Sequence, residues 1–341
     1  MTSVRCFGPI QILIWVGLSV FSQPSLFAQP AQSQQPQTPL IALHWPVDCT
    51  LGETCFLQQY VDHDPGPGAQ DYTCGPLSYD THTGTDIRVA DLVAMEDGAL
   101  VTAAADGTVT AIRDEIEDAY LTPERREALA GKGCGNGVVV AHRDGWQTQY
   151  CHLKLGSITV QPGDQVRSGT PLGQIGLSGF TDFPHLELIV RKDGEVMDPF
   201  APTTGQACGN QGPTLWSSAP DYQAGGFLRS GFATDVPDFQ NIKEGRAALL
   251  SLASDDPALV LWGYAFGVQD GDRMTFAIDS PTGQRFFEHS EDLTRTQAEV
   301  FRAAGQRGPA QGWPAGTYTG TMTLIRDGVI LDQSVVQLPA R

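Results

Sequence analysis

The sequence is short of positive charge. Lysine and arginine together number 21 against 39 aspartates and glutamates, which gives a formal net charge of −18. A surface this acidic repels polyanions, so we expect no nucleic-acid partner. The composition fits a soluble periplasmic or secreted protein, which we expect to be a monomer.

Long helical periodicity is also missing, whereas 38 glycines and 23 prolines are present. This composition is typical of an all-β chain with many tight turns. The predicted strands of the first half are 85–89, 99–103, 107–113, 137–142, 146–152, 157–160, 171–175 and 185–190. Those of the second half are 247–252, 258–268, 273–279, 316–326 and 329–337, and the last two form the terminal hairpin of a β-sandwich.

One helix is predicted, in the charged stretch near 114–133. Thr122 is its cap and Pro123 its first residue, where the missing N–H costs nothing. Because this stretch interrupts a pair of strands, we interpret it as a helical insertion at the surface.

The apolar run near the N-terminus, residues 10–21, falls short of a membrane-spanning helix. It follows Arg5 and precedes a cleavage point at Ala28, a pattern that predicts a signal peptide over 1–28. An uncleaved anchor is the alternative. Residues 29–39, rich in Gln and Pro, predict a disordered linker. We therefore expect a periplasmic or secreted protein with no stable membrane insertion after cleavage.

No Cys-x-x-Cys pair occurs among the 7 cysteines, which disfavours a zinc site made of thiolates. Removing the signal peptide removes Cys6 and leaves an even number, as expected of disulfides in an oxidising compartment. Sequence alone leaves their pairing open. The pairs that we favour are Cys49–Cys55, Cys134–Cys151 and Cys74–Cys208.

The remaining chain is long enough for two domains with separate cores. We expect the first domain over 40–202, where an Asp-Pro-Phe sequence closes it. A linker rich in Gly, Ser, Gln and Pro follows over 203–225. Residues 226–341 are predicted to form a smaller, Ig-like β-sandwich as an accessory domain.

Three short motifs in the first domain carry residues suited to chemistry. They are His82 and Asp86 in His-Thr-Gly-Thr-Asp, His152 in Tyr-Cys-His-Leu, and His185 and Glu187 in Pro-His-Leu-Glu. Zinc accepts histidine nitrogen and carboxylate oxygen, and a catalytic zinc keeps one position for water. We therefore predict a Zn²⁺ site with His82, Asp86 and Glu187 as ligands, and His152 and His185 as catalytic residues that move protons.

Strand geometry relates some of these positions. Side chains alternate along a strand, so His185 and Glu187 are expected on one face. By the same rule Tyr150 and His152 share a face, and Cys151 points the other way, where it suits a disulfide better than a metal.

The order of the motifs resembles that of the lysostaphin/LytM-type zinc metallopeptidases. The matching patterns are His-x-x-x-Asp, Tyr-x-His-Leu, Gly-Asp-x-Val-x-x-Gly-x-x-Leu-Gly-x-x-Gly and Pro-His-Leu-x, within about residues 40–200. The resemblance implies a twisted antiparallel β-sheet core, the duplicated hybrid motif. It also implies that His82 and Asp86 bind zinc and that His152 and His185 are the two non-ligand histidines. In the family the third ligand is the second histidine of His-x-His, and Glu187 stands there.

That departure changes the charge of the site. A His-Asp-Glu set neutralises the whole +2 charge of zinc, whereas His-Asp-His leaves about +1. Water on the metal should then be less acidic than the pKa of about 7 typical of catalytic zinc. A slower enzyme, a shifted pH optimum and a lost activity are all compatible with this change.

The resemblance implies an exported zinc metalloendopeptidase that hydrolyses peptide cross-links of peptidoglycan. Zinc polarises the scissile carbonyl and activates water, while His152 and His185 assist proton transfer and stabilise the oxyanion.

Two other functions are alternatives. One is a weak or inactive murein-binding relative that regulates another cell-wall hydrolase; such relatives lose most of the site, whereas this chain keeps four of the five positions. The other is a biotinyl- or lipoyl-like carrier hairpin at 160–169. The nearest turn lysine, Lys192, lacks the Met-Lys setting that such carriers use.

Overall fold

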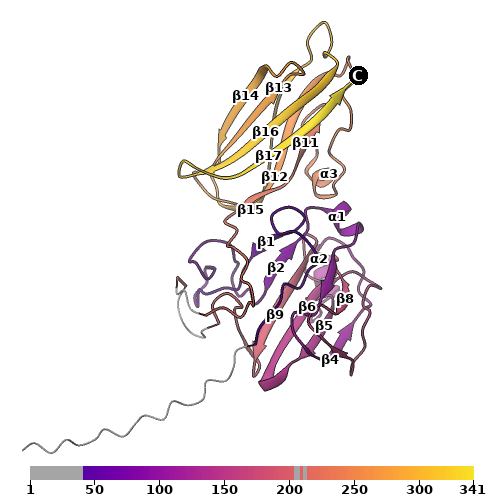
Figure 1. Ribbon diagram of the computed structural model, residues 1–341, viewed down its shortest axis with the longest axis vertical. Coiled ribbons are helices and arrows are strands. Elements are labelled where there is room, and N and C mark those ends of the chain that lie inside the picture. The colour runs from indigo at the N-terminus through magenta and orange to yellow at the C-terminus, as the bar shows by residue number, and fades with distance from the viewer. Residues whose placement is uncertain (1–40, 203–207, 210–212) are drawn as a thin grey trace, which may run out of the picture. The chain divides into compact units, whose positions relative to one another are not determined.

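We describe a computed structural model of the protein over residues 41–202, 208–209 and 213–341 (Figure 1). The predicted signal peptide (1–28) and disordered linker (29–39) lie outside these residues. Residues Leu40–Arg341 form one compact unit. The division into domains at 202 and 226 therefore stays a prediction.

The described chain is nearly all β with antiparallel sheets, as predicted. The largest sheet has the order β1-β2-β9-β6-β5-β4-β7, with β10 paired to β9. Its strands are β1 (Phe56–Gln59), β2 (Thr85–Arg88), β4 (Gly107–Arg113), β5 (Asn136–Ala141), β6 (Trp146–Leu153), β7 (Gln165–Val166), β9 (His185–Lys192) and β10 (Glu195–Val196). A separate pair consists of β3 (Leu100–Thr102) and β8 (Pro171–Gln174).

Strand β9 shows why one face of the large sheet is left for polar residues. Leu186, Leu188 and Val190 are buried in the main hydrophobic cluster. Each such side chain contributes about 1.5–3 kcal/mol when it leaves water. Alternation along the strand then turns His185 and Glu187 to the opposite face.

The C-terminal part contains two further sheets, which form the predicted β-sandwich. Their strands are β11 (Gly226–Ala233), β12 (Ala258–Val268) and β15 (Gln297–Arg307) in one sheet, and β13 (Arg273–Asp279), β14 (Arg285–Asp292), β16 (Gly316–Arg326) and β17 (Val329–Ala340) in the other. Phe232 and Leu261 of the first sheet lie in one buried cluster with Phe276 and Met322 of the second. We call β11–β17 the C-terminal β-sandwich.

Part of the sequence-based prediction for the second half was wrong. No strand covers 247–252; α3 (Phe239–Lys243), capped by Asp238, comes shortly before this segment. Strands β14 and β15 were not predicted, because much of their length is half-exposed and polar. Within the predicted linker 203–225, Leu215 and Trp216 are buried in the main hydrophobic cluster.

The predicted helix is present as α2 (Pro123–Ala128). The Thr122 side chain accepts a hydrogen bond from the Arg125 N–H, and Pro123 opens the helix, as expected. A second short helix, α1 (Leu92–Glu96), was not predicted. None of the helices in the described residues has the length and apolar character that crossing a membrane requires.

The three favoured disulfides are all present. They are Cys49–Cys55, Cys74–Cys208 and Cys134–Cys151. The last joins the end of the 114–133 insertion to β6, next to His152.

Candidate functional site

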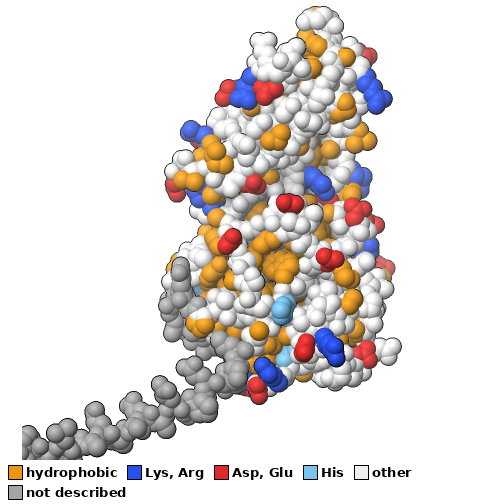
Figure 2. Space-filling model, in the orientation of Figure 1, with side chains coloured by type: hydrophobic (Ala, Val, Ile, Leu, Met, Phe, Trp, Pro, Cys, Tyr) orange, Lys and Arg blue, Asp and Glu red, His pale blue; other side chains and the backbone are white. Residues whose placement is uncertain are grey.

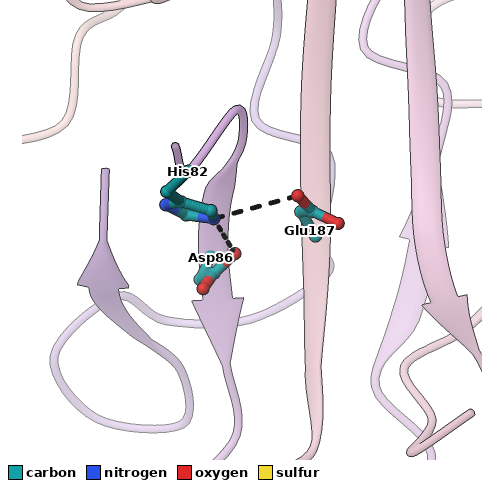
Figure 3. Close-up of side chains that lie close together, drawn as sticks. All are labelled: His82, Asp86 and Glu187. Carbon is teal, nitrogen blue, oxygen red and sulfur yellow. Dashed lines mark hydrogen bonds and ion pairs between the residues drawn. The ribbon is translucent and has the colours of Figure 1, made fainter. Parts of the chain in front are cut away.

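Two neighbouring strands bring the predicted ligands together. In the antiparallel pairing of β2 with β9, Asp86 lies directly opposite Glu187, and Arg88 lies opposite His185. His82 precedes β2 and folds back toward both carboxylates (Figure 3). A local loop and one cross-strand pair therefore assemble residues that are far apart in the chain.

The distances suit a metal ion. His82 Nε2 lies 3.1 Å from Asp86 Oδ1 and 3.8 Å from Glu187 Oε1. One ligand atom of each residue lies within 4.8 Å of the others. Ligands bound to one zinc at about 2.0–2.2 Å are separated by distances of this order. Among the residues that the structure describes, this is the one group of three such side chains found.

The orientation of His82 also fits a ligand. Its Nδ1 lies 2.7 Å from the carbonyl oxygen of Tyr60, to which it must donate because a carbonyl only accepts. That bond leaves Nε2 to face the carboxylates. Histidines that bind metals are oriented in this way by a second hydrogen bond.

Two more imidazoles border the cluster. His152 Nε2 lies 3.4 Å from Glu187 Oε2, and His185 Nε2 lies 3.6 Å from Asp86 Oδ1. The two rings are 4.6 Å apart. All five residues singled out by the sequence thus lie at one place.

His152 reaches the site by a route that strand alternation did not predict. Tyr150 is buried in the core, and its hydroxyl accepts a hydrogen bond from the Ala104 N–H. Regular alternation would send His152 to that same core face. Its φ of 63° breaks the alternation and turns the ring to the site instead. The expectation that Tyr150 and His152 share a face was therefore wrong.

The tautomers of these two histidines match that of His82. His152 Nδ1 donates to the Ser178 carbonyl at 2.7 Å. His185 Nδ1 lies 3.0 Å from the Phe183 carbonyl and 3.2 Å from the hydroxyl of Thr181. Both rings therefore point Nε2 at the carboxylates.

Burial and charge together shift the pKa values of the cluster. Burial alone lowers the pKa of His82, but the charge and hydrogen bond of Asp86, with Glu187, raise it to about 9. Burial raises the pKa of Asp86, but the neighbouring histidines lower it overall. Burial lowers the pKa of His185 to about 4. At neutral pH His82 therefore carries a proton that a metal would displace, and His185 is neutral.

Gly84 is required for the approach of the His82 loop to β9. A Cβ atom built at Gly84 would lie 2.4 Å from Glu187 Cγ and 2.9 Å from its Oε1. The glycine of His-Thr-Gly-Thr-Asp thus leaves the space that the third predicted ligand occupies.

The site is buried but not sealed. The Glu187 side chain is 14% exposed, and the ring of Tyr79, which stacks on His82 at 4.3 Å, is half-exposed. Figure 2 shows histidine side chains at the surface beside a group of hydrophobic side chains.

Two residues that support the site, Asn136 and Ser178, were not predicted from the sequence. Asn136 is fully buried and accepts hydrogen bonds from the N–H groups of Glu115 and Ile116 at 2.8 Å each. The Asn136 N–H donates to the hydroxyl of Ser178, the residue whose carbonyl holds His152. The glycines on either side of Asn136 were the available signal for this close packing.

The chain matches one known protein family over part of its length. Residues 80–199 match the model for peptidase family M23. This part of the chain therefore resembles an M23 domain. All five site residues lie within it, and the resemblance stated from the motifs is confirmed.

The curated relatives match part of this chain. The cell division protein DipM of Caulobacter vibrioides is 40% identical over 68 residues, 20% of this chain and 11% of the relative. The DD-carboxypeptidase/endopeptidase Mpg of Neisseria meningitidis is 31% identical over 120 residues, 35% of this chain and 22% of the relative. The chain thus spans less than a quarter of the length of either relative.

Among solved structures, the catalytic domain of the prophage-encoded M23 protein EnpA of Enterococcus faecalis is 21% identical, with a TM-score of 0.32. The match covers 49% of this chain and 98% of that one.

Proposed function

We propose that the protein is an exported zinc metalloendopeptidase that hydrolyses peptide cross-links of peptidoglycan. One observation carries this proposal: three buried histidines each bond a backbone carbonyl or hydroxyl through Nδ1 and turn Nε2 toward the same two carboxylates. A scatter of polar residues on a β-sheet would not produce this common orientation. The names of the two relatives, one of them an endopeptidase, support a peptidase of the cell envelope.

His82, Asp86 and Glu187 would hold the metal. Zinc bound there would polarise the scissile carbonyl and make water a better nucleophile at neutral pH. The Tyr60 carbonyl keeps the His82 ring oriented for this task.

His185 and His152 would handle protons and charge. His185 is neutral at pH 7, so its Nε2 can accept a proton from the attacking water. His152, on the other side of Glu187, carries a proton on Nδ1 for the Ser178 carbonyl, so it would donate to the oxyanion of the attacked carbonyl once Nε2 has also taken up a proton. Both rings are held by their Nδ1 hydrogen bonds, so they lose little rotational freedom on reaching the transition state.

The test is metal analysis of the purified protein together with digestion of cross-linked murein. We expect about one zinc per chain and new muropeptides, both lost in a His82→Ala variant. Protein that binds no zinc, and that releases no muropeptides even with zinc added, would end the proposal. Zinc binding and murein binding without cleavage would instead favour the inactive relative.

A further inference from the structure

Arg88 is a buried charge beside the site that the proposed mechanism does not use. It lies two residues after Asp86 on β2 and directly opposite His185 on β9. The side chain is 1% exposed. A buried guanidinium must find a counter-charge and acceptors for its N–H groups, or the fold loses several kcal/mol.

The counter-charge comes from the C-terminal β-sandwich. Arg88 Nη1 donates to the carboxylate of Glu299 on β15. Nη2 lies 3.3 Å from the hydroxyl of Tyr264 on β12, and the guanidinium lies 5.4 Å from the centre of that ring. Its other acceptors are the Gln58 side chain and the carbonyls of Val89 and Ala90.

The other side of the guanidinium faces the site through one aromatic ring. It lies 4.7 Å from the centre of the Phe183 ring. Phe183 in turn stacks on His185, with ring centres 4.4 Å apart and planes 26° apart. Contacts therefore run without a gap from Glu299 through Arg88 and Phe183 to the imidazole of His185.

A second ion pair links the same parts of the chain but has no such connection. Arg229 on β11 lies 2.6 Å from Asp91, which caps α1. Neither side chain has a described contact with the five residues of the site. This pair is therefore a matched control for general effects of loosening the contact between the C-terminal β-sandwich and the first half of the chain.

We propose that Glu299 and Arg88 are positioning residues, through which the C-terminal β-sandwich fixes the His185 imidazole against Phe183. Removing the Glu299 charge leaves the Arg88 guanidinium without its carboxylate, so it moves and Phe183 loses its stacking partner. His185 then samples orientations in which Nε2 no longer faces the metal site. The catalytic consequence rests on the proposed function, whereas the structural consequence does not.

The experiment uses full-length Glu299→Gln, which keeps the shape of the side chain, with Arg229→Gln as the control. Arg88→Lys and the double variant Arg88→Lys/Glu299→Gln complete a double-mutant cycle. The first readout is the NMR shift of the His185 ring protons, assigned with a His185→Gln variant. Stacking on Phe183 displaces these shifts by ring current, so they report the contact in protein without metal or substrate.

In Glu299→Gln we expect the His185 resonances to move toward their positions in an unstacked imidazole, with little change in Arg229→Gln. We expect kcat on murein to fall about tenfold with KM unchanged, because a small misplacement of a proton-transfer group slows the chemical step. The double variant should be no slower than the worse single variant, because the two residues act as one unit.

Unchanged His185 resonances in Glu299→Gln would overturn the proposal, as would equal effects of Glu299→Gln and Arg229→Gln. If the wild type fails to cleave murein, the proposed function fails, but the NMR comparison still decides the positioning role.

Discussion

Glu187 occupies the place where the family pattern has a histidine, and the structure keeps it at the site. Its carboxylate lies opposite Asp86 and within 3.4–3.8 Å of His152 and His82. The substitution therefore alters the charge of the donor set more than its arrangement. Imidazole suits zinc better than a second carboxylate does, and it leaves more positive charge on the metal.

Glu187→His is the direct test of this change. We expect zinc affinity to rise about tenfold and murein cleavage to stay equal or increase. Competition with a chromogenic chelator measures the first, and muropeptide release the second. A variant with weaker zinc binding would show that the surroundings are tuned to the carboxylate, or that Glu187 is not a ligand.

Gly84→Ala tests the packing of the loop against the same residue. The new methyl group would overlap Glu187 Cγ, so the carboxylate must move away from His82. We expect zinc affinity to fall about tenfold while the unfolding midpoint changes little. Thr83→Ala in the same loop is the control; an equal loss in that variant would point to the loop rather than to the overlap.

The raised pKa of His82 predicts proton release on metal binding. With a pKa of about 9 the ring is protonated at pH 7, and the metal must displace that proton. Calorimetry in buffers of different ionisation enthalpy should detect about one proton released per zinc at pH 7, and apparent affinity should rise up to about pH 9. Release of no proton at pH 7 would contradict the raised pKa.

The same shift affects the stability of the metal-free protein. Because the pKa of His82 is higher in the folded chain than its ordinary 6.5, protonation stabilises the fold fully below about pH 6.5. This contribution is lost as the pH rises through about 9.

At the scale of elements, the insertion and the turn that holds His152 depend on each other. Asn136 holds the start of the insertion through Glu115 and Ile116, and it donates to the carbonyls of Ile116 and Leu153. The same segment is tied to β6 by the Cys134–Cys151 disulfide. These bonds maintain the positive φ of His152, a conformation that costs about 1–3 kcal/mol.

Asn136→Ala, which removes one amide group, should therefore destabilise the fold strongly. It removes the side-chain partner of the buried Ile116 N–H and C=O and of the Glu115 N–H, and we expect the free energy of unfolding to fall by about 3 kcal/mol. Urea denaturation measures this value. Asn241→Ala, at an exposed position of α3, should change it by less than about 0.5 kcal/mol.

At the scale of the whole molecule, one buried cluster contains residues of both halves of the described chain. Phe56 and Ala90 pack in it with Trp262 and Phe266 of the C-terminal β-sandwich. This cluster, with the ion pairs of Arg88 and Arg229, predicts that residues 41–341 unfold together. Scanning calorimetry should give one transition. Two separate transitions would show that the interface contributes little to stability.

The sequence motifs predicted the resemblance to the peptidase family and the all-β class, and they singled out five residues that the structure brings together. They succeed because a metal site needs specific residue types at short spacing, and because glycine-rich turns and alternating strands leave a local signal. The three disulfides favoured from the sequence are present, although the sequence left other pairings open. Strands β14 and β15 were not predicted, because their polar sequences show little alternation of apolar and polar residues.

Only the tertiary structure decided how those residues act together. The positive φ of His152 depends on distant partners such as Ser178, so alternation along β6 gave the wrong face. The link from Glu299 through Arg88 to His185 joins residues about 200 positions apart in sequence, which no local pattern encodes. The chain itself specifies which side chains are available for chemistry, whereas packing between distant segments sets their tautomers, pKa values and orientation.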